Sequence, residues 1–184
     1  ETVGELLDII NNYESIDKKN GKQLDLSKYP LPVSKFSQFA SRQVEKLTKQ
    51  MYHVKGSGQS NLPKDTNFLL CCNHRTVLDP GFICSCLPEK IVKKTCIIGK
   101  ADLVENKILK TFVLNHNIIP IDRSGNSIQT LDRSRQLLLE GWNILIFPEG
   151  TNVENNTKLL PLKDGAAKLS IATNRPIVPV HLTG

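Results

Sequence analysis

The sequence predicts an α/β fold, with a mostly parallel central sheet flanked by helices and an amphipathic helix near the N-terminus. Two observations lead to this prediction. Short apolar runs alternate with segments of helical length from about residue 65 onward, and two earlier stretches repeat their apolar residues at helical spacing. The 184-residue chain is 39% apolar and 23% charged, a composition that supports a buried core and argues against global disorder.

The first helical pattern covers residues 2–12, with one apolar face formed by Val3, Leu6, Leu7 and Ile10. Thr2 followed by Glu5 matches a capping box at its start. This segment resembles the last helix of an acyl carrier domain, and a plain amphipathic helix is the alternative. Residues 14–32 are polar and rich in turn signals, as in Asn20-Gly21, which is typical of a linker. We therefore expect the end of a carrier domain at 1–13, a linker at 14–32 and the main domain at 33–184, shortened at its C-terminus.

The second helical pattern covers residues 33–54, where apolar residues recur at steps of three and four: Val33, Phe36, Ala40, Val44, Leu47, Met51 and Val54. The positive charge of the chain is concentrated here. Residues 33–64 carry a net +5, against −2 for residues 1–32 and +3 for residues 65–184. Two interpretations fit. The apolar face covers the core and the basic residues are solvated, or the helix rests on an anionic membrane surface.

The remaining elements follow in order. Residues 68–72 form a continuous apolar run, typical of a strand buried on both faces. Further strands are expected at 95–98, 117–121, 143–147 and 176–182, and helices at 82–87, 101–114, 127–140 and 165–173. Gly141 is placed to end the third of these helices. Strands that alternate with helices in this way favour a parallel sheet.

The first chemical motif directly follows the first expected strand. His74 and Asp79 are separated by five positions, so neither a helix nor a strand brings them together, and the chain must turn between them. Pro80 disfavours helical geometry at Asp79 and favours a loop there. A carboxylate that accepts from one imidazole nitrogen leaves the other free as a general base. An ordinary turn with a capping His and Asp is the alternative.

Other candidate residues also follow expected strands, where sites gather in α/β folds. The segment Phe147-Pro148-Glu149-Gly150-Thr151 fits a turn that presents backbone N–H groups to an anion. Arg123, in Ile121-Asp122-Arg123, can grip a phosphate with its guanidinium or simply pair with its neighbour. Lys100 follows the second expected strand and carries the same two alternatives.

Together these blocks resemble the glycerolipid acyltransferases, the family of 1-acylglycerol-3-phosphate acyltransferases. The resemblance runs from Tyr52 to Gly184 and rests on His-x4-Asp, Ile-Asp-Arg, Phe-Pro-Glu-Gly-Thr and Ile177-Val178-Pro179-Val180, in that order. It implies acyl transfer from acyl-CoA or acyl carrier protein to the hydroxyl of a lysophospholipid, without an acyl-enzyme and without a cofactor. The catalytic residues it implies are His74 as base and Asp79 as its orienting partner. The substrate-binding residues it implies are Lys100, Arg123, Glu149, Gly150 and Thr151.

The sequence departs from the family pattern at several positions. Asn117 and Pro120 stand where the family usually has Gly and Phe or Val, and Asn152-Val153 replaces the usual Arg-Ser after Glu-Gly-Thr. Loss of that Arg removes a cation from the expected phosphate region. A lysophospholipid with a larger head group therefore becomes a credible acceptor.

Charge and cysteine content narrow the remaining function classes. The longest apolar run is 68–72, far short of the roughly 20 residues that a spanning helix needs. The five cysteines are an odd number without a disulfide spacing, which favours a reducing, cytoplasmic compartment. The basic amphipathic stretch at 33–54 leads us to expect a protein that is peripheral at a membrane surface. Few aromatics accompany the basic stretch, so we expect no nucleic-acid partner.

Zinc binding is a further alternative, because four cysteines and a histidine cluster within a short segment: Cys71, Cys72, His74, Cys84 and Cys86. Their spacings do not match the usual zinc pairs, so we expect packing cysteines and no metal. A catalytically inactive lipid-binding module at the membrane surface is the main alternative to an enzyme.

Overall fold

The computed structural model describes residues 26–30, 35–100, 117–121, 127–150 and 161–183. Its centre is a five-stranded sheet in which every pairing is parallel, in the order β3-β2-β4-β1-β5. The strands are β1 (Leu69–Cys72), β2 (Thr95–Lys100), β3 (Ile118–Ile121), β4 (Asn143–Ile146) and β5 (Ile177–Val180). The predicted α/β class and all five predicted strands are confirmed.

The described helices are α2 (Lys35–Met51), α3 (Asp79–Cys86), α4 (Glu89–Val92), α7 (Ser127–Leu139) and α8 (Gly165–Thr173), with short 3-10 turns η2 (Leu26–Lys28) and η3 (Gln59–Asn61). Helix α8 has the predicted bounds, and α7 ends before Gly141, whose φ of 85° fits the predicted helix stop. The short helix α4 is not in the sequence prediction. The helices predicted at 2–12 and 101–114 lie outside the described residues.

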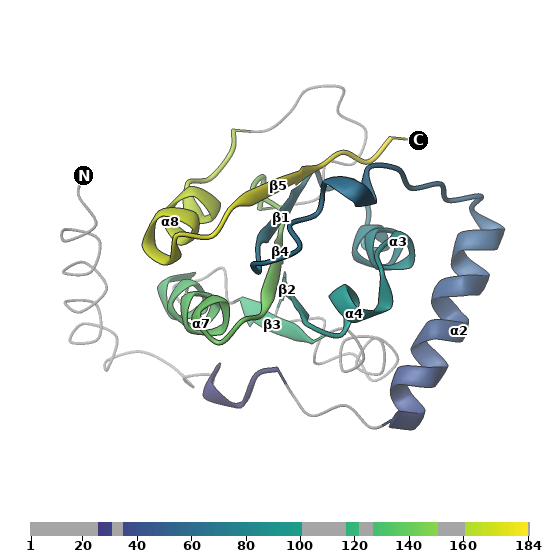
Figure 1. Ribbon diagram of the computed structural model, residues 1–184, viewed down its shortest axis with the longest axis horizontal. Coiled ribbons are helices and arrows are strands. Elements are labelled where there is room, and N and C mark those ends of the chain that lie inside the picture. Colours follow the sequence, from purple (N-terminus) through teal and green to yellow (C-terminus); the bar gives the residue numbers. More distant parts are fainter. Residues whose placement is uncertain (1–25, 31–34, 101–116, 122–126, 151–160, 184) are drawn as a thin grey trace.

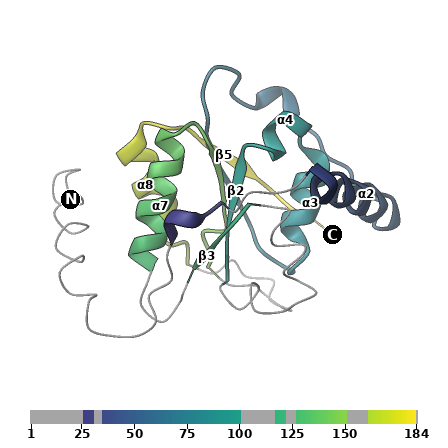
Figure 2. The same ribbon diagram turned by 90° about the horizontal axis from the view of Figure 1, so that it is seen from below.

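Helices cover both faces of the sheet (Figures 1 and 2). Helices α7 and α8 lie on one face, and α3 and α4 lie on the other, with α2 outside α3. Alternate residues of β1 feed these two layers: Leu69 packs with the α7 and α8 side, and Leu70 packs with the α3 side. A strand buried on both faces explains why its sequence is a continuous apolar run. Each fully buried Leu or Ile of this core contributes roughly 1.5–3 kcal/mol to folding.

Helix α3 begins three residues earlier than the sequence pattern indicates, so the prediction of a loop at Asp79 is wrong. Asp79 is the first residue of α3, and Pro80 lies in its first turn. Proline is tolerated there because a backbone N–H in the first turn has no partner within the helix. The chain still turns between His74 and Asp79, because residues 73–78 form a loop that connects the end of β1 to the start of α3.

The orientation of helix α2 is opposite to the one expected if its apolar face covered the core. Four of its apolar side chains are exposed: Phe39 is 61%, Val44 50%, Leu47 58% and Met51 73% exposed. Its polar side meets the protein instead.

The contacts on that polar side explain the orientation of α2. Arg42 forms an ion pair with Glu89 at the start of α4, and the Lys49 ammonium donates to the Ser85 carbonyl of α3. Hydrogen bonds from Arg42 and then Lys93 lower the pKa of Glu89 to about 2. The basic residues of α2 are therefore partly occupied by the protein, and the apolar stripe of the helix is left exposed.

Within the part of the chain that the structure describes, no helix has both the length and the apolar character needed to cross a membrane.

Candidate active site

The polar residues of the site meet where the parallel strands end. His74 follows β1 by two residues, Glu149 follows β4 by three, and Leu182 follows β5 by two. Because β4 and β5 are the two neighbours of β1, these segments converge although they are far apart in sequence. This edge of a parallel sheet is where binding sites form in α/β folds.

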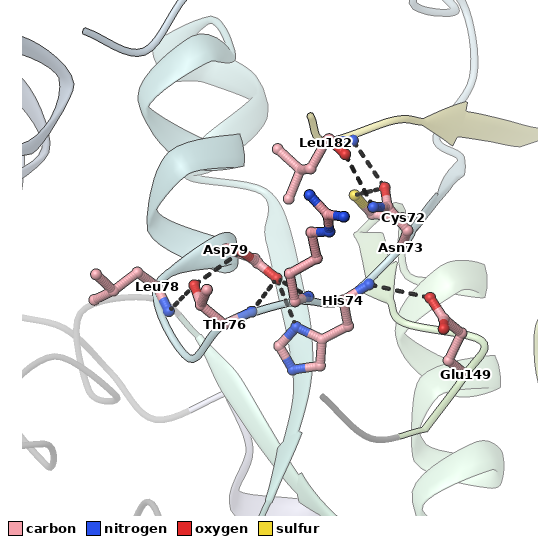
Figure 3. Close-up of polar contacts among 9 residues, drawn as sticks. Cys72, Asn73, His74, Thr76, Leu78, Asp79, Glu149 and Leu182 are labelled. Carbon is pink, nitrogen blue, oxygen red and sulfur yellow. Dashed lines mark hydrogen bonds and ion pairs between the residues drawn. The ribbon is translucent and has the colours of Figure 1, made fainter. Parts of the chain in front are cut away.

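The predicted contact between His74 and Asp79 is confirmed. His74 Nδ1 lies 2.9 Å from Asp79 Oδ2 (Figure 3). The loop after β1 leads His74 toward the first turn of α3, where Asp79 is only 3% exposed. The turn between the two residues therefore produces the pairing that neither a continuous helix nor a continuous strand could give.

Asp79 is held as a carboxylate by several donors. Its Oδ2 also accepts from the backbone N–H groups of Arg75 at 2.6 Å and Thr76 at 2.9 Å, and its Oδ1 accepts from the Thr76 hydroxyl at 3.0 Å. Burial acts to raise the pKa of Asp79, but the hydrogen bonds from His74, Thr76 and Arg75 outweigh it and hold the pKa below its usual value. Asp79 is therefore ionised at neutral pH.

The ionised partner determines the tautomer of a neutral His74. A carboxylate can only accept, so the proton between the two residues belongs to His74 Nδ1 and the lone pair belongs to Nε2. Figure 3 shows the second ring nitrogen on the side of the ring away from Asp79. The ring also stacks on Phe147, with centroids 4.0 Å apart and an interplanar angle of 22°. Nε2 can thus accept a proton from a bound hydroxyl.

Glu149 contacts the backbone of His74. The His74 N–H donates to Glu149 Oε1 at 3.2 Å (Figure 3), and Glu149 is only 5% exposed. Glu149 belongs to the turn after β4, which is closed by the Gly150 N–H donating to the Phe147 carbonyl at 2.9 Å. Gly150 has a φ of 70°, which favours glycine.

Two further residues join the site that the sequence did not single out for it. The Asn73 side chain donates to the Leu182 carbonyl at 3.0 Å and accepts from the Leu182 N–H at 2.8 Å. Lys163 crosses the turn after β4: a methyl group on Gly150 would lie 2.9 Å from both Cε and Nζ of Lys163. The signal for Asn73 was its position directly before His74.

The other predicted site residues are placed in part or not at all. Lys100 is the last residue of β2, and its backbone is in register with Ile121 at the end of β3. Arg123 and Thr151 lie outside the described residues. The structure therefore brings together His74, Asp79, Glu149 and Gly150, and it does not test the positions of the Lys100, Arg123 and Thr151 side chains.

Of the four cysteines near the site, Cys72 and Cys84 are buried in the core as predicted, Cys71 packs against the core, and Cys86 is half-buried. Cys72 and Cys84 belong to the cluster under α3, and Cys96 to the cluster under α7. Burial raises the pKa of Cys71 to about 11, and burial together with the negative charge of Asp79 raises the pKa of Cys72 to about 12. Both thiols are therefore protonated and weakly nucleophilic at neutral pH. Among the described residues, no group of three or more His, Cys, Asp and Glu side chains is arranged to hold a metal ion.

The sequence is similar to a protein-family model and to known proteins. The sequence model of a family described as Acyltransferase matches residues 53–183. The chain is 30% identical over 132 residues to the 1-acyl-sn-glycerol-3-phosphate acyltransferase of Bacillus subtilis (strain 168), covering 71% of this chain and 63% of that protein. It is 27% identical over 181 residues to a probable 1-acyl-sn-glycerol-3-phosphate acyltransferase of Mycoplasma pneumoniae, covering 94% of this chain and 61% of that protein.

A solved structure supports the fold. The chain resembles the crystal structure of the 1-acyl-sn-glycerophosphate (LPA) acyltransferase PlsC from Thermotoga maritima with a TM-score of 0.57 and 23% identity. The match covers 81% of this chain and 60% of that one. The chain thus spans less than two thirds of the length of each of these relatives.

Proposed function

This chain belongs to the acyltransferase family, and on that basis we propose that it transfers a fatty acyl group from a thioester to the hydroxyl of a lysophospholipid. The proposed acceptor is 1-acylglycerol 3-phosphate, and the proposed donor is acyl-CoA or acyl carrier protein. The observation that carries the proposal is the His74–Asp79 pair, which engages Nδ1 and keeps the Nε2 lone pair of His74 available as the proton acceptor at the strand ends. The proposed reaction is a step in phospholipid synthesis.

In the proposed reaction, His74 Nε2 accepts the proton of the acceptor hydroxyl as that oxygen attacks the thioester carbonyl. The new C–O bond forms a tetrahedral oxyanion, which collapses with cleavage of the C–S bond. The leaving thiolate takes the proton back from the imidazolium, so His74 ends the cycle neutral. A thioester is already activated, and therefore no covalent enzyme intermediate is needed.

Asp79 supports both states of His74 in this scheme. Its carboxylate holds the Nδ1 proton, which keeps the Nε2 lone pair directed at the substrate, and its negative charge stabilises the imidazolium that forms during attack. Cys71 and Cys72 lie just before His74 in the sequence, but their raised pKa values argue against a thiolate nucleophile. The chemistry is thus best supported as general-base catalysis with direct transfer.

We assign recognition of the acceptor phosphate to cations near the same edge. The register of Lys100 with Ile121 supports a role for Lys100 and for Arg123, which lies two residues further along the chain. The Lys163 amine beside Gly150 adds a positive charge at the turn after β4. Gly150 and Thr151 complete the proposed acceptor site. This set of cations can compensate for the Arg that Asn152 replaces.

Membrane association belongs to the same proposal. The exposed apolar stripe of α2, with Leu47 and Met51 among its members, fits insertion into the boundary between lipid head groups and acyl chains. Lys46 is also exposed on this helix and would face anionic head groups. We propose a peripheral position on the cytoplasmic side of a membrane, where a lysophospholipid acceptor is available.

A thiol-release assay with acyl-CoA and a panel of lysolipids tests the function. We expect thiol release that depends on the acceptor, and a loss on the order of 10²-fold or more in the His74→Asn variant. His53→Asn is the matched control, because His53 is exposed and should leave the rate unchanged. Equal rates for the two variants would overturn the mechanism.

The exposed face of α2 also favours a second candidate, a lipid-binding module without activity. That candidate predicts binding to anionic vesicles with no thiol release from any donor and acceptor pair. Acceptor-dependent thiol release by the wild-type protein would exclude it.

A further inference from the structure

We propose that Glu149 is a positioning residue for His74, and that it acts through the His74 backbone N–H instead of binding the acceptor as the family resemblance implies. This inference rests on the proposed function for its activity test. It concerns which quantity Glu149 controls, the turnover of bound substrate or the affinity for the acceptor.

The geometry of Glu149 fits a positioning role. Its Oε1 accepts from the His74 N–H at 3.2 Å, across 75 positions of sequence, and the residue is only 5% exposed. A buried carboxylate is costly unless it has hydrogen-bond donors. The His74 N–H likewise needs an acceptor where the chain leaves β1. The His74 N–H finds its acceptor in Glu149, and with 5% of the residue exposed little of Glu149 remains for a ligand to touch.

Asn73 holds the same piece of backbone from the other side. Its side-chain amide pairs with both the N–H and the carbonyl of Leu182, at 2.8 and 3.0 Å. These two hydrogen bonds extend the pairing of β1 with β5 by one more step. The segment from Asn73 to His74 is therefore fixed by the chain after β4 on one side and the chain after β5 on the other (Figure 3).

A fixed backbone matters because the imidazole has to meet two partners at once. Nδ1 must stay 2.9 Å from Asp79 while Nε2 meets the attacking hydroxyl. A displacement of about 1 Å at such a site can cost on the order of 10² in rate. Glu149 should consequently influence kcat, with little effect on the KM of the acceptor.

Two substitutions separate the roles. Glu149→Gln keeps a carbonyl oxygen that can accept from the His74 N–H, whereas Glu149→Leu has a similar size and no acceptor. We expect kcat within about threefold of wild type for Glu149→Gln and a fall of about 10-fold to 100-fold for Glu149→Leu, with the acceptor KM within about twofold in both. A rise in acceptor KM in both variants, with kcat retained, would overturn the proposal and make Glu149 an acceptor ligand.

A second measurement does not depend on activity. The chain has four histidines, so selective ¹⁵N labelling gives four backbone amide signals, and His74→Asn identifies that of His74. We expect this signal to stay near its wild-type position in Glu149→Gln and to move in Glu149→Leu, more than the other three. No movement in Glu149→Leu would overturn the positioning role.

The two measurements also distinguish failure of this inference from failure of the proposed function. If the wild type releases no thiol, the proposed function fails, and the amide signal still tests the hydrogen bond. Glu149→Ser is too short to reach the N–H and serves in place of Glu149→Leu if that variant does not fold.

Discussion

Replacing Asp79 with Asn removes a charge at the centre of the proposed mechanism with almost no change in shape. An amide oxygen at the position of Oδ2 still accepts from His74, Arg75 and Thr76, the three donors that meet there. The amide nitrogen then lies where Oδ1 accepted from the Thr76 hydroxyl, which can rotate. The substitution should therefore preserve the local geometry while removing the negative charge.

The expected loss of activity follows from the distance between the two groups. His74 Nδ1 lies 2.9 Å from the carboxylate, so the imidazolium that forms during attack is in direct contact with a negative charge. Two opposite unit charges about 4 Å apart interact by about 4 kcal/mol at an effective dielectric constant of about 20. Losing this term from the transition state lowers kcat on the order of 10³-fold.

The assay is thiol release from acyl-CoA at saturating acceptor, which gives kcat and KM separately for wild type and Asp79→Asn. Asp65→Asn is the matched control, since Asp65 is exposed and should leave both constants unchanged. Circular dichroism confirms that each variant is folded. A kcat for Asp79→Asn within about threefold of wild type would refute the assignment of imidazolium stabilisation to this residue.

The same variant predicts a change in acid stability. The native state lowers the pKa of Asp79, so its ionisation stabilises the fold fully above the unfolded value of about 3.9 and is lost as the pH falls through the lower native value. The difference in free energy of unfolding between wild type and Asp79→Asn should be largest above about pH 5 and shrink below about pH 4. Urea unfolding across this range measures it, and a difference independent of pH would contradict the lowered pKa.

Two more predictions concern the turn after β4 and the exposed face of α2. Gly150→Ala should lower thiol release because the added methyl group displaces the Lys163 side chain. Gly141→Ala is the control: its φ is 85° and no atom lies within 4 Å of the added methyl, so it should lose only about 1–2 kcal/mol of stability, a backbone cost that both variants share. Equal activities of the two variants would show that Lys163 has no role in the reaction. Leu47→Glu should weaken binding to anionic vesicles in a sedimentation assay. Leu139→Glu makes the same change at an exposed residue of α7 (54% exposed) and should not weaken binding. Equal binding by the two variants would argue against α2 as the membrane contact.

Much of the sheet could be predicted from sequence because each strand is short, apolar and bounded by turns. The run at 68–72 has to be buried on both faces, and burial on both faces is typical of a parallel sheet. The pairing of His74 with Asp79 followed from the same reasoning, since only a turn brings residues five apart into contact.

The orientation of α2 could not be obtained in this way. Periodicity shows that Val44, Leu47 and Met51 share a face of the helix, but it does not say which face meets the protein. That choice depends on an ion pair between Arg42 and Glu89, whose partners are 47 positions apart. The contact between Glu149 and the His74 N–H was missed for a similar reason, because it depends on β4 lying beside β1.

The strand order also has a consequence for how the protein folds. Strand β1 is the first described strand in the chain, yet its two neighbours in the sheet are β4 and β5, the last two. On the ribosome, β1 must therefore wait for both partners until the chain has been synthesised as far as Val180 at the end of β5, and contacts of such long sequence separation slow folding. During this interval β1 has unpaired edges and exposed apolar side chains, which make it prone to aggregation. Recovery of thiol release during refolding should accordingly coincide with docking of β5 and lag behind formation of the helices.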